Sequence, residues 1–187
     1  KVVDTFREEH TGLAVRRTGE LSVTWLPSIY KKIKFGTHEN VGWGEIHLPE
    51  STMHTTGYWI EFPEKAAEML DIKQTELSEA LNTLRQVAPV QVMCDPTDIR
   101  AQGMLRAPFS ELPTIYLYET YPGGVGFSEK LFTHHRRLFE AAVSLVSGCT
   151  CKEGCPSCTG PSLEVGAHGK RGALRLAQMA LGNAREH

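Results

Sequence analysis

The sequence predicts an α+β domain with an antiparallel, strand-rich N-terminal half and a helical C-terminal half, with a cluster of four cysteines between the last two helices. Three observations support this fold class. β-Branched and aromatic runs dominate the chain up to Pro63, and helical periodicity dominates most of the chain after it. Four of the five cysteines lie in "SGCTCKEGCPSC", residues 147–158. Strands followed by helices are typical of α+β domains.

The N-terminal strands are expected where apolar and polar residues partly alternate. These runs are "LAVRR", "ELSVTWL", "WGEIHL" and "GYWIEF", separated by the turn-like stretches "RRTGE" and "GTHEN". They indicate an antiparallel sheet or meander. The chain begins "KVVDTFREE" without a methionine, which indicates a fragment of a longer protein or a processed chain.

The helical part is expected to start at Pro63 and to include "PEKAAEML" and "TELSEALNTLRQVA". Pro89 is expected to end the second helix, and "VQVMC" to form a short buried strand before the turn "DPTD". Residues 101–112 resemble a loop, "TIYLYE" a strand and "TYPGGVG" a glycine-rich turn. Two amphipathic helices come next, "FSEKLFTHHRRLFEAAVSLVS" ending near Gly148 and "GALRLAQMALGNA".

Composition limits the class of protein. The 187 residues suffice for one large domain, and 41% hydrophobic with 22% charged residues is usual for globular proteins. No apolar run reaches the roughly 18 residues of a membrane span, so we expect no membrane contact. Cysteine is absent from the first half of the chain, which argues against a distributed disulfide framework. We therefore expect a reducing, cytoplasmic setting.

The cysteines Cys149, Cys151, Cys155 and Cys158 could form disulfides, act as redox thiols or bind a metal. A disulfide between Cys149 and Cys151 would be strained, and thioredoxin-like C-x-x-C pairs start a helix after a strand, unlike this one. Four thiolates suit tetrahedral Zn²⁺, and a set of four leaves no open position, so one structural zinc ion is expected. An iron–sulfur cluster accepts the same ligands and is the minor alternative.

Nucleic-acid contact is a weaker expectation, because the net charge is -2. Basic residues are nonetheless bunched, and they would form a binding surface only if the fold brings them together. They are Lys31, Lys32, Lys34, Arg136, Arg137, Lys170 and Arg171. The turn containing Gly123, Gly124 and Gly126 could hold phosphate through its backbone N–H groups, although a tight turn with positive φ explains it more simply.

Two further features have structural explanations. Cys94 ends an apolar run and is expected to be a buried structural thiol, with a nucleophilic role as the alternative. Asp95 and Asp98 are expected to form a turn, and His134 and His135 to face solvent or a partner from mid-helix.

The succession "PTIYLYETYPGGVGFSEKLF", helix and "CTCKEGCPSC" resembles the C-terminal region of superfamily-2 DNA helicases of the mitomycin repair factor A type, and "LRQVAPVQVMCDPTDI" is similar to the segment before it. The resemblance covers roughly residues 45–160. It implies an ATP-dependent DNA-unwinding repair enzyme whose two motor lobes precede this chain. Cys149, Cys151, Cys155 and Cys158 would match the metal ligands of that family.

The resemblance makes the chain a single accessory domain, residues 1–187, with a strand-rich part (1–63), a helix–strand–helix part (64–148) and a zinc knot with the last helix (149–187). Its partners would be the motor domains of the same polypeptide and, directly or indirectly, DNA. The chain alone would hydrolyse no ATP, because the ATP motifs of the family have no counterpart here. A stand-alone zinc module for protein contact and a small thiol enzyme using Cys94 are the alternatives.

Overall fold

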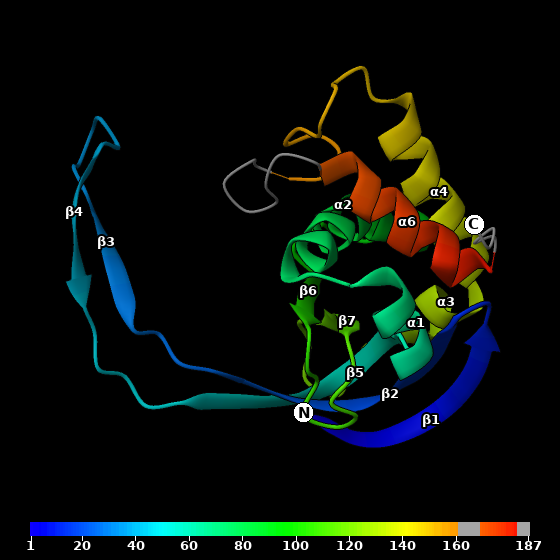
Figure 1. The fold of residues 1–187 in the computed structure, drawn as a ribbon. Coiled ribbons are helices and arrows are strands. Elements are labelled where there is room, and N and C mark those ends of the chain that lie inside the picture. The colour runs from blue at the N-terminus through cyan, green and yellow to red at the C-terminus, as the bar shows by residue number, and fades with distance from the viewer. Residues whose placement is uncertain (161–168, 183–187) are drawn as a thin grey trace.

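The computed structural model describes residues 1–160 and 169–182, and it confirms the α+β class (Figure 1). A five-stranded sheet has the order β1-β2-β5-β7-β6, and every neighbouring pair is antiparallel. Its strands are β1 (Val2–Thr11), β2 (Ala14–Trp25), β5 (Ser51–Glu61), β6 (Ile99–Met104) and β7 (Thr114–Glu119). The sheet therefore combines strands from both sides of the predicted division at residue 63, and that division stays a prediction.

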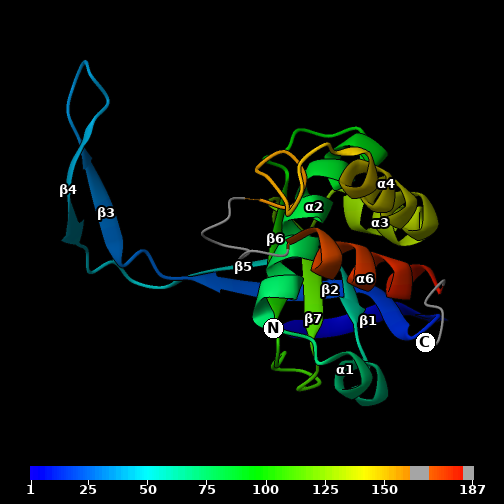
Figure 2. The ribbon, with the colours of Figure 1, turned by 45° about the horizontal axis from the view of Figure 1, so that its top comes forward.

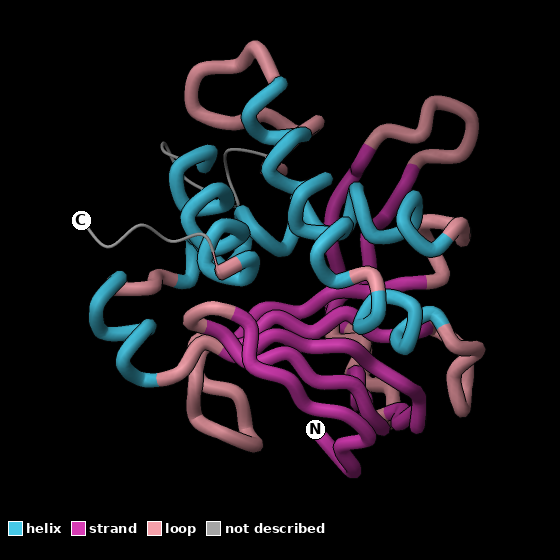
Figure 3. Tube along the Cα trace, turned by 90° about the vertical axis from the view of Figure 1, so that its right-hand side faces the viewer, coloured by secondary structure: helices cyan, strands magenta, loops and turns pink. Residues whose placement is uncertain are grey.

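The helices cover mainly one face of this sheet (Figure 3). They are α1 (Glu64–Leu70), α2 (Gln74–Val92), α3 (Phe127–Thr133), α4 (His135–Gly148) and α6 (Gly169–Leu181). Because side chains alternate along a strand, Tyr58 and Ile60 of β5 point into the core beneath the helices. Trp59 points to the opposite face, where a smaller cluster forms with Leu21 and Tyr116.

A second, two-stranded sheet stands apart from this body (Figures 1 and 2). It consists of β3 (Ile29–Ile33) paired with β4 (Asn40–Glu45), and the chain enters it from β2 and leaves it for β5. We call residues 26–50 the arm. Every residue of β3 is exposed, so the arm has little of the burial that normally holds a strand pair in place.

Three expectations about strands were wrong. The stretch "RRTGE" is the middle of β2 and not a turn, because Gly19 lets β1 approach: a Cβ on Gly19 would lie 2.0 Å from the carbonyl oxygen of Asp4. "VQVMC" is not a strand: Val90–Val92 end α2, Met93 caps the helix and Cys94 follows it. The predicted loop 101–112 begins inside β6, where Ala101 pairs with Leu117 of β7.

Two expectations about helices were also wrong. Pro89 does not end α2, because the buried apolar stripe continues to Val92; the helix ends at Val92, and Met93 caps it with a φ of 57°. The long predicted helix is divided at His134 into α3 and α4. The last helix begins earlier than expected, at Gly169, and residues 183–184 of its predicted span lie outside the described residues. Among the residues that the structure describes, none of the helices is long and apolar enough to cross a membrane.

Candidate metal centre

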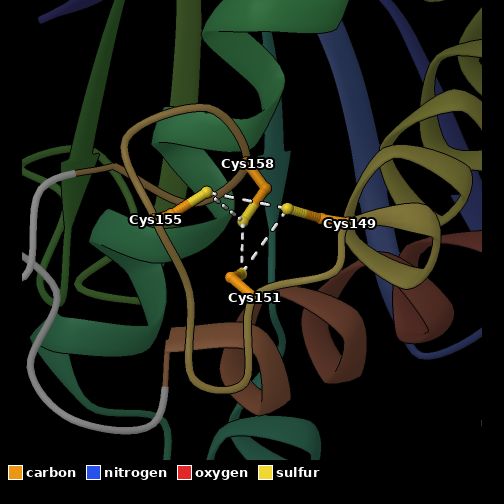
Figure 4. Close-up of side chains that lie close together, drawn as sticks. All are labelled: Cys149, Cys151, Cys155 and Cys158. Atoms are coloured by element: carbon orange, nitrogen blue, oxygen red, sulfur yellow. Dashed lines mark hydrogen bonds between the residues drawn. The ribbon is translucent and has the colours of Figure 1, made fainter.

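The four sulfur atoms of Cys149, Cys151, Cys155 and Cys158 converge on one point (Figure 4). Cys149 directly follows α4, and the other three lie in the loop that leads towards α6. All four Sγ atoms lie within 4.8 Å of one another. Four of the Sγ–Sγ separations are 3.5 or 3.6 Å, too long for disulfide bonds, and all the cysteines are free.

This geometry fits a zinc ion. Zinc–sulfur bonds of about 2.3 Å in a tetrahedron place the sulfur atoms about 3.8 Å apart, close to the observed separations. A ring of four thiolates also leaves no ligand position for substrate or water, which is the arrangement of structural sites. The predicted clustering of the four thiols is thus confirmed.

The protein environment shifts the pKa values of two of the thiols, Cys149 and Cys158, in opposite directions. The backbone N–H of Cys151 donates to the sulfur of Cys149, which lowers the pKa of Cys149 to about 7. Burial raises the pKa of Cys158 to about 12. A thiol with so high a pKa becomes a ligand only when a cation displaces its proton, so metal binding here releases protons.

Helix α2 supports the metal loop from one side. The hydroxyl group of Thr83 lies 2.9 Å from the carbonyl oxygen of Cys158 and donates to it in a buried setting. The amide of Gln86 donates to the carbonyl of Pro156 at 3.3 Å. Gly160 has a φ of 102° and lies so close to α2 that a Cβ would stand 2.4 Å from the Nδ2 atom of Asn82. The sequence does not reveal these supporting residues, because the helical periodicity of α2 gives no sign that a threonine in it contacts a distant loop.

Helix α6 supports the loop from the other side. The backbone N–H of Lys170 donates to the carbonyl of Glu153 at 3.2 Å, and its ammonium group donates to the carbonyl of Cys149. Lys170 therefore brings a positive charge to the thiol cluster, which would offset the net -2 of a zinc ion with four thiolates. The loop joins α4, α2 and α6, three helices that pack on one another.

The structure does not bring the basic residues together into one surface. Lys31, Lys32 and Lys34 lie on the arm, away from the helices (Figures 1 and 2). Arg136 and Arg137 follow His135 at the start of α4, and the Nε2 atom of His135 lies 2.9 Å from the carbonyl of Ala180 near the end of α6. Lys170 and Arg171 lie at the other end of α6, about 15 Å along its axis. Nucleic-acid contact by these residues stays a prediction, with at least three separate locations.

The backbone N–H groups at the glycine-rich turn before α3 bind a carboxylate of the protein itself, that of Glu119. Gly123, Gly124 and Gly126 all have positive φ, as expected for a tight turn. The carboxylate of Glu119, fully buried at the end of β7, accepts from the backbone N–H of Val125 at 2.5 Å and of Ser128 at 2.7 Å. The N–H groups of Gly123 and Gly124 donate to the carbonyls of His54 and Tyr121. Phosphate binding at this turn stays a prediction, and the structure favours the simpler explanation.

The other candidates from the sequence are Cys94, Asp95 and His135, and their contacts do not form a catalytic site. Cys94 is half-buried, and its burial, together with Asp98 and Asp95, raises the pKa of its thiol, which opposes a nucleophilic role. Asp95 accepts from the backbone N–H of Thr97 at 2.8 Å, which confirms the turn. The expectation for His135 was wrong: it is buried and lies 2.7 Å from the hydroxyl of Tyr58, because α4 turns this residue towards the sheet.

Comparison with known proteins points to one family. Residues 80–159 match the family model of the MrfA Zn-binding domain. The uncharacterized ATP-dependent helicase YprA of Bacillus subtilis is 39% identical over 180 residues, which are 94% of this chain and 24% of the relative. The ATP-dependent helicase HRQ1 of Saccharomyces cerevisiae is 25% identical over 134 residues, 63% of this chain and 12% of that protein.

Solved structures agree with this result. The crystal structure of the DUF1998 helicase MrfA bound to DNA has a TM-score of 0.75 at 37% identity, and the match covers 96% of this chain and 24% of that one. A further crystal structure of the DUF1998 helicase MrfA has a TM-score of 0.67 at 32% identity, over 94% of this chain and 23% of that one. The chain thus spans about a quarter of the length of YprA and of the MrfA structures, and the match to HRQ1 covers 12% of that protein.

Proposed function

Because residues 80–159 belong to the family of MrfA Zn-binding domains, we propose that the chain is the structural zinc-binding accessory domain of an ATP-dependent DNA repair helicase. In this proposal residues 1–187 act as one accessory unit. Its partners are the motor lobes of the same polypeptide; the match to YprA covers only 24% of that helicase, which leaves room for such lobes. The domain supports the architecture of the motor and the loading of DNA, and the chemistry of ATP hydrolysis belongs to the lobes.

The observation that carries the proposal is the convergence of four cysteine sulfur atoms between α4 and α6. We assign Cys149, Cys151, Cys155 and Cys158 as the zinc ligands, because their Sγ atoms all lie within 4.8 Å of one another. When bound, zinc supplies a cross-link between helices and no reactive position. The protein's own residues do the rest: Thr83 holds the loop to α2, and Lys170 holds it to α6.

A cytoplasmic, reducing setting is part of the proposal. All five cysteines are free, and four thiolate ligands persist only where thiols stay reduced. The two chemical alternatives, a redox pair and a thiol enzyme, receive less support, since the cluster has four members and the pKa of Cys94 is raised.

Metal analysis of the purified chain tests the zinc assignment. We expect one zinc per chain, a colourless protein, and loss of the metal in Cys155→Ser but not in the matched control Cys94→Ser. Loss of the metal should lower the melting temperature by roughly 5–10 °C, which corresponds to about 2–3 kcal/mol for a domain of this size. Visible absorption with bound iron, or equal melting temperatures with and without chelator, would contradict a structural zinc site.

The accessory role is tested by activity. The purified chain should hydrolyse no ATP, with or without DNA. In the full-length protein, Cys155→Ser should reduce DNA unwinding much more than it reduces ATP binding, because the lobes that bind ATP lie outside this domain. ATP hydrolysis by the chain alone, or an unwinding rate unchanged by loss of the metal, would overturn the proposed role.

A further inference from the structure

The arm exposes an unusual combination of side chains. Large apolar groups are exposed along it, although it contributes nothing to the two buried clusters of the body. They are Leu26, Ile29, Tyr30, Ile33, Phe35, Val41, Trp43 and Leu48. Its three lysines, Lys31, Lys32 and Lys34, form no ion pair with any carboxylate that the structure describes. Neither feature adds to the buried core of the body, so both point to a binding partner.

The register of β3 and β4 sorts these residues onto two different faces. Tyr30 pairs with Gly44 and Lys32 with Gly42, so these four residues share one face. We call it the Tyr30 face. Ile29, Lys31 and Ile33 point to the other side, together with Trp43 and Glu45. The two neighbouring lysines Lys31 and Lys32 therefore lie on opposite faces of the same strand.

The two glycines shape the Tyr30 face into a flat platform. A Cβ on Gly44 would lie 2.5 Å from the ring of Tyr30, so the ring lies across the opposite strand. The side chain of Lys32 passes over Gly42, with its Cδ 4.0 Å from the position of a Cβ there, and its ammonium group lies 5.9 Å from the centre of the Tyr30 ring. Glycine is needed at position 44 because a side chain there would displace the Tyr30 ring, and Gly42 has a φ of 146°, a backbone conformation that favours glycine.

The charge of this platform has one sign. Within the paired strands, the carboxylate of Glu45 belongs to the other face, opposite Ile29. Glu39 lies in the connecting turn, where the hydroxyl group of Thr37 donates to it at 3.3 Å. An aromatic ring with an ammonium group beside it, and no carboxylate on the same face, suits a stacked base with its phosphate.

We propose that the Tyr30 face binds single-stranded DNA, with a base stacked on Tyr30 and a backbone phosphate at Lys32. A single strand fits better than a duplex, because only unpaired bases can leave their own stack to lie on a protein ring. The choice of DNA rests on the proposed helicase function, since unwinding produces single strands. The other face also places an ammonium group near an aromatic ring, with Lys31 5.6 Å from the centre of the Trp43 ring, but it carries the carboxylate of Glu45, and we assign it no part in this contact.

Anisotropy titrations of the zinc-loaded chain with a labelled oligothymidylate test the inference. Tyr30→Ala should weaken binding roughly fivefold to a hundredfold, the loss of one base–aromatic stack, and Tyr30→Phe should retain it. Lys32→Ala should reduce the slope of log affinity against log salt by about 0.7, the loss of one phosphate contact to a single strand. Lys31→Ala is the matched control, because it removes the same charge one residue away on the other face, and it should leave the slope unchanged.

Each alternative outcome has a distinct meaning. Equal effects of Lys31→Ala and Lys32→Ala would show general electrostatic attraction and overturn the assignment of a face. Duplex binding as tight as single-strand binding, or full affinity in Tyr30→Ala, would overturn the stacking site. Arm substitutions that weaken only the association with the motor lobes would overturn it too and make the arm a protein-docking element instead. Zinc content and melting temperature, measured on the same samples, separate failure of this inference from failure of the structural zinc site.

Discussion

Replacing Glu79 by glutamine should make the protein relatively more stable as the pH rises. Glu79 is only 3% exposed, and its Oε2 atom has no hydrogen-bond partner among the described residues. The carboxylate faces the first turn of α6, where a Cβ on Gly172 would lie 2.1 Å from Oε2. Burial, and next the charge of Glu76, raise the pKa of Glu79 to about 7, whereas the N–H of Ala173 donates to the carboxylate and opposes the shift.

The sign and size of the effect follow from proton linkage. Below pH 4.5 the carboxyl group is protonated in both states and does not affect the free energy of unfolding. Between pH 4.5 and about 7 the unfolded chain loses its proton and the folded chain keeps it, so stability falls as the pH rises. Above pH 7 the loss is complete, at about 3 kcal/mol for a shift of this size.

Urea unfolding of the zinc-loaded protein across this pH range measures the effect. Glu79→Gln removes the titration, so the difference in unfolding free energy between Glu79→Gln and wild type should grow by about 2.5 kcal/mol from pH 5 to pH 8 in favour of glutamine. Any constant cost of burying the amide cancels in that difference. Glu64→Gln, at an exposed position of α1, changes the net charge equally and should give no such trend. Parallel curves for wild type and Glu79→Gln would refute the reasoning.

Three other substitutions test the supports of the fold. Thr83→Val leaves the carbonyl of Cys158 buried without its donor and should cost about 1–3 kcal/mol in urea unfolding, whereas Thr75→Val, exposed on the same helix, should cost far less. Gly12→Ala should lower the free energy of unfolding by about 2–4 kcal/mol, because φ is 57° and the new Cβ would lie 2.2 Å from the Cα of Gly182. Its control is Gly148→Ala, which has open space around it and should change the free energy of unfolding by less than about 0.5 kcal/mol. Burial lowers the pKa of His135 to about 4, so wild type should lose up to about 3 kcal/mol as the pH falls from 6.5 to 4, and His135→Gln should lack this loss; identical acid sensitivity would show that His135 does not titrate as its setting requires.

The metal cluster was predictable because its ligands are local. Ten residues contain all four thiols, so their types and spacing specify the site without knowledge of the fold. The turn at Gly123 was predictable for the same reason, since positive φ favours glycine. The group that occupies that turn was not predictable: the carboxylate of Glu119 reaches Val125 and Ser128 only because β7 ends beside α3.

The errors arose where distant parts of the chain decide local structure. Proline normally breaks a helix, but α2 continues past Pro89 because Val92 is buried in the core. Gly19 resembles a turn residue, and it serves instead for the close approach of β1 to β2. The pairing of β6 with β7, and the contact of His135 with Tyr58, depend on the order of strands in the sheet, which a single sequence does not display.

The short spacing of the thiols also affects how the chain folds. Gathering groups that span ten residues costs little chain entropy, whereas the contact of Thr83 with Cys158 joins groups 75 residues apart and costs about 2 kcal/mol more to close. The unfolded polypeptide can therefore bind zinc before the helices pack together. A metal ion that binds both the folded and the unfolded chain stabilises the folded state only by the difference between its two binding free energies. Zinc should remain on the chain through much of a urea transition, and the loaded loop can serve as an early template on which α2, α4 and α6 assemble.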